Sequence, residues 1–166
     1  MEVERVPFPE ALESLARRAR LEMPKRARSE GSQQNAGRKT DSLLVVEWAV
    51  NLMNQALRTG QSAMADNARQ YVLQRKLSDE TVGHFKLGYH PEDWNWFLEK
   101  AKGRFTPAQL VSAGLIQERN NGPGYFDNLV GRLVFPIFDE RGRPVAFGGR
   151  VLPGGNIESD AKYWNS

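Results

Sequence analysis

Glycines, cations and aromatic rings are concentrated near the end of this chain. Two adjacent glycines precede an arginine in Phe147–Arg150, and Lys162–Ser166 offers a lysine, two rings and an amide. Glycine lets backbone approach a ligand closely, cations pair with phosphates, and rings stack on bases. Together these residue types predict a groove for a single-stranded nucleic acid.

The element expected to position Arg150 is a β-hairpin. Two apolar runs flank a polar Asp-Glu-Arg-Gly turn, a pattern typical of two antiparallel strands. With the turn centred near Arg141, Arg132 falls opposite Arg150 at the open end, so we expect their guanidinium groups to form one cationic patch. Arg141 and Arg143 would be solvated at the tip. A carboxylate partner for each arginine is the alternative, and Asp127 is the main candidate.

Helical spacing dominates the chain before this hairpin. Periodic apolar residues, capping residues and breakers predict five helices: 41–57, 64–75, a short one capped by Ser78, one starting at Pro91, and one capped by Thr106. A brief strand is expected at 87–89, and further strands from Leu115 onward. Helices first and strands last predict an α+β fold, with a helical N-terminal part followed by a small antiparallel sheet and hairpin region.

The first forty residues are expected to lie outside this domain. Apolar residues at helical spacing predict a helix that starts at Pro9 and ends before Pro24. Residues 25–40 are polar, with no apolar side chain larger than alanine, so they have little to bury. We therefore expect a helical segment at 1–23, a flexible linker at 24–40 and a domain at 41–166.

Composition predicts a soluble, cytoplasmic protein that binds no membrane. No apolar run approaches the roughly 18 residues of a membrane span, and the N-terminus is unlike a signal peptide. A net charge of +3 favours nucleic acid only slightly. The chain has no cysteine, and its two histidines are too few for a tetrahedral zinc site.

Six segments match a series of motifs in order. Asn67–Val82 resembles A-R-x-Y-L-x-x-R-G-L-S-x-E-x-I, Phe85–Trp94 resembles F-x-L-G-Y-A-P-x-x-W, and Leu110–Leu115 resembles L-x-x-A-G-L. R-x-x-F-P-I, F-G-G-R and K-Y-x-N-S follow at residues 132–137, 147–150 and 162–166. In this order the motifs resemble the RNA polymerase core of bacterial DnaG-type DNA primases, in its N-terminal subdomain. Residues 6–16 resemble the helix that closes the zinc-binding domain of that family.

The resemblance implies a role for particular residues. Arginines would contact phosphates, the rings of a tryptophan and a tyrosine would stack on bases, and a lysine would lie near the phosphates of the incoming or initiating nucleotide. The residues implied to bind nucleic acid or nucleotide are Arg69, Trp94, Arg132, Arg150, Lys162, Tyr163 and Asn165. For Arg69 the simpler alternative is a surface cation, and for Trp94 it is a core residue.

The resemblance also implies partners and an activity. The family synthesises RNA primers on single-stranded DNA template from ribonucleoside triphosphates, and meets the replicative helicase through regions outside this chain. Its Mg²⁺ ions are held by a Toprim subdomain and its Zn²⁺ by a zinc-binding domain, and neither has a counterpart here. We therefore expect no catalytic or metal-binding residue in this chain, which would be inactive alone but part of a DNA-directed RNA polymerase.

Two other functions stay open from the residues alone. The same basic and aromatic groove would suit a non-catalytic single-strand-binding module, and an acidic Toprim motif after Ser166 would distinguish the two. A helical protein-interaction domain would instead require basic residues scattered over the surface.

The chain departs from the family pattern in three places. Asn128–Gly131 stands where the family often carries Arg-Phe-Arg, which removes two cations. Pro153–Ala161 replaces a shorter Pro-Lys connection, and Lys76 replaces a glycine. These changes predict a less positive rim to the groove.

Overall fold

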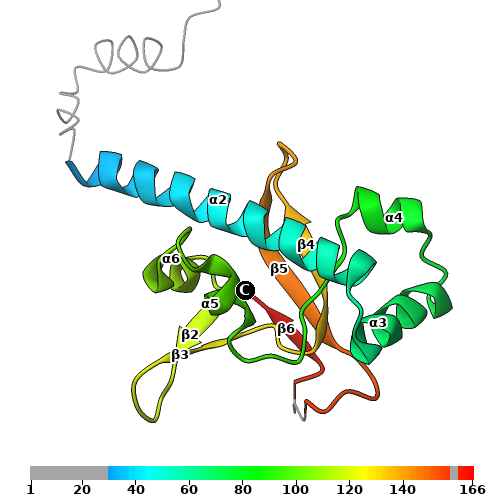
Figure 1. Ribbon diagram of the computed structural model, residues 1–166. Helices are drawn as coiled ribbons and strands as arrows, with labels where there is room; N and C mark the ends of the chain where they lie inside the picture. Colours follow the sequence, from blue (N-terminus) through cyan, green and yellow to red (C-terminus); the bar gives the residue numbers. More distant parts are fainter. Residues whose placement is uncertain (1–29, 158–160) are drawn as a thin grey trace, which may run out of the picture. The chain divides into compact units, whose positions relative to one another are not determined.

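The structure, a computed structural model, describes residues 30–157 and 161–166, with side chains from residue 42 onward. The chain divides into two units, Met1–Asn35 and Ala36–Ser166. The helix expected at 9–23 lies outside the described residues. The elements, drawn in Figure 1, are α2 (Glu30–Thr59), α3 (Ala63–Gln74), α4 (Asp79–His84), β1 (Gly88–Tyr89), α5 (Trp96–Ala101), α6 (Pro107–Ser112), β2 (Ile116–Glu118), β3 (Tyr125–Asp127), β4 (Arg132–Phe138), β5 (Pro144–Val151) and β6 (Tyr163–Asn165).

Helix α2 begins well before the residue at which the sequence predicted it to begin. The prediction placed the start at Asp41, whereas the helix begins at Glu30 and takes in part of the expected linker. Residues 30–40 include glutamine, alanine, arginine and lysine, which have high helix propensity without contributing an apolar stripe. Apolar periodicity therefore missed this part of the helix. The flexibility expected of the linker stays a prediction.

The predicted α+β class is confirmed. The strands form a four-stranded antiparallel sheet in the order β1-β4-β5-β6, and β2 pairs with β3 in a separate hairpin. Helix α2 packs on one face of the larger sheet, where Val50 and Met53 join Val134 and Phe147 in a buried cluster (Figure 1). Helix α3 contributes Tyr71 to a second buried cluster, which includes Leu133 of β4. Among the described residues, no helix is both long and apolar enough to cross a membrane.

The register of the β4–β5 hairpin differs by one residue from the sequence prediction. Phe138 pairs with Pro144, but Ile137 pairs with Ala146, so Val145 is an extra residue on β5. This bulge shifts by one residue every β4–β5 pair between the bulge and the open end of the hairpin. Leu133, not Arg132, lies opposite Arg150, while Arg132 pairs with Val151.

The shifted register separates the two arginines that were expected to form one patch. Successive side chains of a strand point to opposite faces, and directly paired residues share a face. Arg132 therefore lies on the face that packs against α2, and Arg150 lies on the other face. The prediction of a joint Arg132–Arg150 patch is wrong, because a hairpin turn read from sequence does not reveal a bulge beside it.

Among the helices after α2, two begin at the caps that the sequence predicted and one does not. The side chains of Ser78 and Thr106 accept hydrogen bonds from the first turns of α4 and α6, as expected. Helix α5, however, begins at Trp96 and not at Pro91. The Asp93 carboxylate accepts a hydrogen bond of 2.9 Å from the Asn95 N–H, which closes a turn before the helix. Trp94 consequently lies in a turn.

The backbone conformation at Lys76 explains why the family pattern has glycine at this position. It follows the C-cap of α3 with a φ of +58°, in the left-handed region that favours glycine. Its N–H donates to the Leu73 carbonyl, and the Leu77 N–H donates to the Val72 carbonyl, which together form a Schellman ending. The Cβ of Lys76 therefore strains the connection between α3 and α4.

Lys76→Gly should stabilise the domain. Removing the Cβ relieves left-handed strain, and part of that gain is offset by the greater freedom of glycine in the unfolded chain. We expect the free energy of unfolding in urea to rise by about 0.5–1 kcal/mol. Lys76→Ala is the matched control, because it removes the charge but keeps the Cβ, and it should leave the value almost unchanged. Equal effects of the two substitutions would rule out backbone strain as the cause.

Candidate nucleic-acid interface

Arg150 lies at the centre of a cluster of cations and rings. Its guanidinium carbon is 5.4 Å from the centre of the Tyr71 ring and 5.2 Å from that of Tyr163. It also donates a hydrogen bond to the Tyr163 hydroxyl. A second arginine, Arg75, lies 5.1 Å from the centre of the Tyr71 ring and donates a 3.2 Å hydrogen bond to the Tyr71 hydroxyl. These four residues, Tyr71, Arg75, Arg150 and Tyr163, are called the Arg150 cluster below.

The Arg150 cluster presents positive charge next to an accessible ring. The two arginines have no carboxylate partner among the ion pairs of the described residues. Tyr163 is 58% exposed, so its ring retains an open surface although Arg150 lies against it. Cations without acidic partners beside an exposed ring can contact both the phosphate and the base of an unpaired nucleotide.

Two members of the Arg150 cluster were not predicted from sequence. Tyr71 and Arg75 stand in the same motif as Arg69, on α3 or at its end, but only Arg69 was selected. The motif letters carried the signal, since A-R-x-Y-L-x-x-R contains all three residues. What the letters could not show is which of them faces the sheet.

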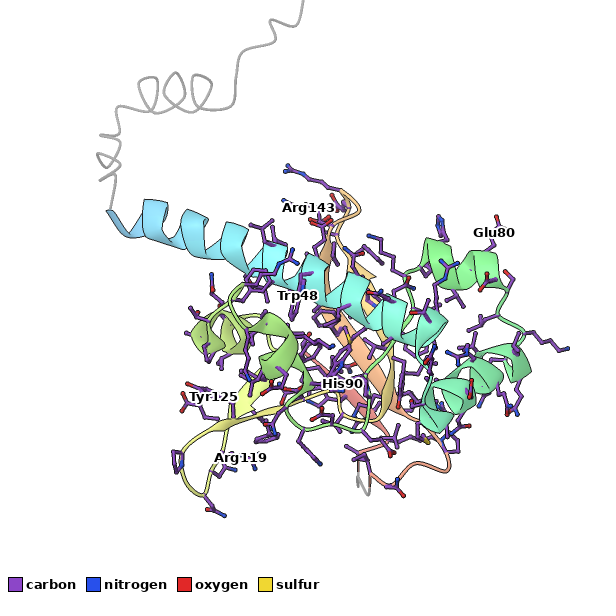
Figure 2. All side chains as sticks on the ribbon, in the orientation of Figure 1. Trp48, Glu80, His90, Arg119, Tyr125 and Arg143 are labelled. Atoms are coloured by element: carbon purple, nitrogen blue, oxygen red, sulfur yellow. The ribbon has the colours of Figure 1, made fainter. Side chains whose placement is uncertain are left out.

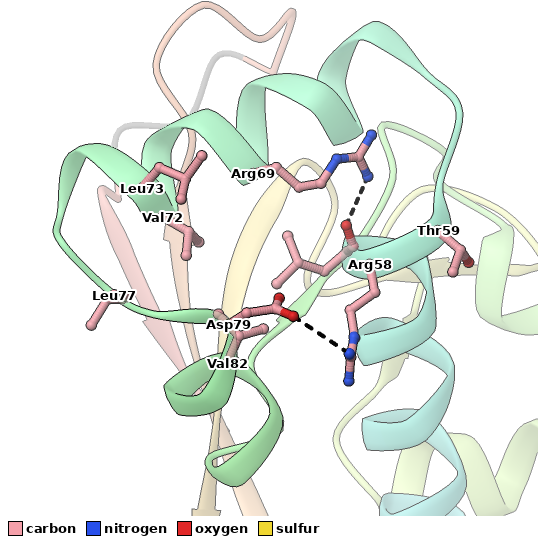
Figure 3. Close-up of a pocket in the computed structure, with 9 residues that line it drawn as sticks. Arg58, Thr59, Arg69, Val72, Leu73, Leu77, Asp79 and Val82 are labelled. Atoms are coloured by element: carbon pink, nitrogen blue, oxygen red, sulfur yellow. Dashed lines mark hydrogen bonds and ion pairs between the residues drawn. The ribbon is translucent and has the colours of Figure 1, made fainter.

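Arg69 instead closes the end of a neighbouring helix. Its guanidinium donates hydrogen bonds of 2.8 Å to the Leu57 and Gly60 carbonyls, at the C-terminus of α2, and also pairs with Asp66. Figure 3 shows the side chain reaching from α3 towards this helix end. Arg69 also lines a hollow of about 390 Å³. Binding of Arg69 to phosphate stays a prediction, but the structure gives this arginine another task.

Arg132 is buried and holds the strand that carries Tyr163. Only 5% of it is exposed, and its guanidinium donates to the carbonyls of Ala161 at 3.1 Å and Lys162 at 3.4 Å. Burial lowers the pKa of Arg132 from its usual range. A contact of Arg132 with phosphate stays a prediction. In the structure its hydrogen bonds join the start of β4 to the residues just before β6.

The two glycines before Arg150 serve opposite faces of the sheet. A Cβ on Gly149 would lie 2.8 Å from a methyl carbon of Leu129 and 3.0 Å from Cδ of Arg132. Gly149 therefore makes room for the protein's own buried side chains. Gly148 lies on the opposite face, paired with Asn165, and a Cβ there would be 3.4 Å from the Asn165 Oδ1 atom. Gly148 thus keeps backbone accessible beside the amide.

The remaining predicted residues lie on exposed surface. Lys162 and Asn165 are both exposed, immediately before and within β6. Trp94 is 47% exposed and lies with Asn95, Arg119 and Phe126 around an open hollow, called the Trp94 hollow below. The Trp94 and Phe126 ring centres are 6.0 Å apart, and the Arg119 guanidinium is 6.0 Å from the Phe126 ring centre. Sequence reasoning missed Arg119 and Phe126, which no motif marks.

Asp127 does not pair with Arg132 or with Arg150. Its carboxylate is buried, lies 3.0 Å from the His90 Nε2 atom, and accepts a 2.7 Å hydrogen bond from the Phe97 N–H. Within the part of the chain that the structure describes, no group of three or more histidine, cysteine or acidic side chains could hold a metal ion.

Fold and site together define a small α+β module with a cationic and aromatic sheet face. A family model described as DNA primase catalytic core, N-terminal domain, matches residues 54–166. The DNA primase of Escherichia coli strain K12 is 35% identical over all of this chain, which spans 27% of that protein.

Solved structures agree with this match. A DnaG primase catalytic domain bound to ssDNA superposes with a TM-score of 0.67 and 31% identity, over 78% of this chain and 40% of that one. A second structure is the RNA polymerase domain of Mycobacterium tuberculosis DnaG in complex with double-stranded DNA that has a 6-nucleotide overhang. It superposes with a TM-score of 0.66 and 31% identity, over 76% of this chain and 38% of that one. The chain belongs to the family of DNA primase catalytic core N-terminal domains.

Arg69→Ala should act on stability. Its two hydrogen bonds to carbonyls at the end of α2 involve a charged donor, and losing them should lower the free energy of unfolding by about 1–3 kcal/mol. Urea denaturation of the chain measures this value. Arg58→Ala is the control, because its pair with Asp79 is long, at 3.7 Å, and exposed, so its removal should cost no more than about 0.5 kcal/mol. A loss for Arg69→Ala as small as that for Arg58→Ala would contradict the assigned role.

Proposed function

We propose that this chain is the nucleic-acid-binding wall of a DNA primase that synthesises short RNA primers on single-stranded DNA. The observation that carries the proposal is the Arg150 cluster, in which Arg150 lies against the exposed ring of Tyr163 and Arg75 against the ring of Tyr71. Neither arginine forms an ion pair with an acidic side chain among the described residues. Family membership supports the same conclusion, and so does the ssDNA bound to a solved relative.

Each part of the proposed wall has a distinct task. Arg150 and Lys162 neutralise phosphates, which positions a strand without reading its sequence. Tyr163 stacks on a base with the ring surface that Arg150 leaves open, and Trp94 offers a second stacking surface. Arg132 acts from beneath, because its hydrogen bonds to the Ala161 and Lys162 carbonyls hold β6 in place.

The chemical step is proposed to belong to other parts of a longer protein. The described residues do not fit a Mg²⁺ or Zn²⁺ site, since none of their acidic or histidine side chains form a suitable group. We propose that the metal-binding carboxylates, the zinc-binding domain and the contacts with the replicative helicase lie outside this chain. Ribonucleoside triphosphates and the RNA primer would meet the wall at Lys162 and Asn165.

The alternative function is a single-strand-binding module without polymerase activity. It uses the same cluster, so binding experiments on the chain do not distinguish it from a primase wall. An acidic motif in the coding sequence after Ser166 would favour the primase.

Arg150→Ala should reduce the salt dependence of single-strand binding. Each cation that displaces a counterion contributes roughly 0.7 to the slope of log affinity against log salt for single strands. We expect the slope to flatten by about that amount in fluorescence anisotropy with a labelled oligonucleotide.

The hairpin tip provides the control for this experiment. Arg141 is exposed there, whereas Arg143 is paired with Asp139, whose pKa is lowered to about 2 chiefly by hydrogen bonds from Arg143. Arg141→Ala should leave the slope unchanged. If Arg141→Ala flattens the slope as much as Arg150→Ala, binding depends on general basicity and the proposed wall is wrong.

Tyr163→Ala should weaken binding and also disturb Arg150. Loss of a stacked base costs about 1–3 kcal/mol, and loss of the ring and hydroxyl frees the guanidinium of Arg150. We therefore expect the Arg150→Ala and Tyr163→Ala effects on affinity to be non-additive, by about 0.5 kcal/mol or more. Strict additivity in the double variant would show that the two side chains bind independently.

The purified chain should not synthesise primers. With single-stranded template, Mg²⁺ and ribonucleoside triphosphates, we expect no primer products, while template binding is retained. The control is a full-length bacterial primase under the same conditions. Primer synthesis by the chain alone would overturn the assignment of catalysis to other parts of the protein.

A further inference from the structure

A buried histidine–aspartate pair is hydrogen-bonded to the turn that carries Trp94. His90 is 0% exposed and Asp127 is 1% exposed, and the His90 Nε2 atom is 3.0 Å from the Asp127 Oδ2 atom. The rings of Trp96 and Phe97 make edge contacts with the imidazole, and their centres lie 4.9 and 4.7 Å from its centre. Figure 2 labels His90 among the crowded side chains near the middle of the picture. No part of the proposed function uses this pair.

The pair binds the turn that carries Trp94 at several backbone positions. The His90 Nδ1 atom is 2.7 Å from the Pro91 carbonyl oxygen. The Asp127 N–H donates to the Trp94 carbonyl at 2.9 Å, and the Asp127 carboxylate accepts from the Phe97 N–H at 2.7 Å. The turn is therefore held before, at and after Trp94.

The same residues attach this turn to the larger sheet. The His90 N–H donates to the Arg132 carbonyl at 3.0 Å, and the Gly131 N–H donates to the Pro91 carbonyl at 3.2 Å. Arg132 starts the strand that pairs with β5, on which Arg150 lies. The Trp94 turn and the strand of Arg150 are thereby fixed to one sheet.

Hydrogen-bond chemistry requires a proton at the Nδ1 atom of His90. The Pro91 carbonyl oxygen can only accept, so the contact of 2.7 Å is a hydrogen bond only if Nδ1 donates. The second proton lies between Nε2 and the Asp127 carboxyl group, on one or the other. Asparagine at position 127 does not preserve this pattern, because the Asp127 Oδ2 atom alone faces both the His90 Nε2 atom and the Phe97 N–H. An amide oxygen in that place accepts from Phe97 but shares no proton with Nε2, and an amide nitrogen there cannot accept from Phe97.

We propose that His90 and Asp127 are positioning residues for nucleic-acid binding. They hold the Trp94 ring beside Phe126 and at a fixed place relative to the Arg150 cluster, so that one single strand meets both. This inference rests on the proposed function for its role in binding, but the positioning of Trp94 can be measured without nucleic acid.

The decisive experiment is a double-mutant cycle on the affinity of the chain for a labelled single-stranded DNA oligonucleotide. His90→Ala should weaken binding about five- to tenfold, a part of the contribution of one stacked base. In a Trp94→Ala background the same substitution should change the affinity less than about twofold, because its effect passes through Trp94. A merely structural role would weaken binding equally in both backgrounds, and that result would overturn the proposal.

Two further variants separate positioning from loss of folding. Asp127→Asn keeps the shape of the side chain but loses one hydrogen bond of the pair, so it should weaken binding about as His90→Ala does, and by less than about twofold in the Trp94→Ala background. His84→Ala is the matched control, since His84 is the other histidine, is exposed and has its ring against that of Phe85, so its loss should not alter affinity. An affinity of Asp127→Asn equal to that of the unsubstituted chain, or a large loss for His84→Ala, would contradict the proposal.

Two NMR signals test the pair in the absence of DNA. The unsubstituted chain should show a slowly exchanging ring proton on Nδ1 of His90, and His90→Ala should shift the indole N–H signal of Trp94. If the chain binds no single strand but both signals behave as expected, the proposed function fails while the positioning stands. An unprotonated Nδ1, or an unshifted indole signal, would show that the pair does not position Trp94.

Discussion

The one-residue bulge at Val145 fixes which side chains of the β4–β5 hairpin share a face of the sheet with the Arg150 cluster. Without it, Phe138–Pro144 pairing would continue to an Arg132–Arg150 pair on one face. With it, Arg150 pairs with Leu133 and lies near the rings of Tyr71 and Tyr163, while Arg132 points to the other face. The same shift places Gly149 where Arg132 and Leu129 need space, and Gly148 on the open face. One inserted residue thus places the buried Arg132 and the arginine of the proposed binding face on opposite sides of the sheet.

The site is supported by buried polar groups beneath an exposed surface. Arg132 binds the carbonyls that precede β6, and the His90–Asp127 pair binds the turn that carries Trp94. Buried polar groups are stable only when hydrogen-bonded, so each of them constrains the backbone that it contacts. The Arg150 cluster and the Trp94 hollow therefore lie on backbone that is held from inside. Such support favours binding, because less conformational freedom is lost when a strand docks.

The sequence predicted the elements better than the contacts between them. Caps at Ser78 and Thr106, the α+β order and the hairpin all follow from local patterns, and the structure confirms them. Local patterns do not reveal a bulge, so the register and the joint patch of Arg132 and Arg150 were wrong. Nor do they show which way an arginine on α3 points, so Arg69 was selected and Arg75 was missed. Arg119 and Phe126 approach Trp94 only through the fold, and no sequence signal could have found them.

The most direct test of the central claim is an NMR titration of the 166-residue chain with a single-stranded DNA oligonucleotide. If the sheet face around Arg150 is the nucleic-acid wall, the backbone amide signals of Gly148, Arg150, Tyr163 and Asn165 should shift together and saturate. Signals of Gly142 at the hairpin tip and of Leu73 beside the hollow at α3 should stay in place. Shifts centred on the hairpin tip or on the hollow beside Leu73, with the Arg150 face unchanged, would contradict the account.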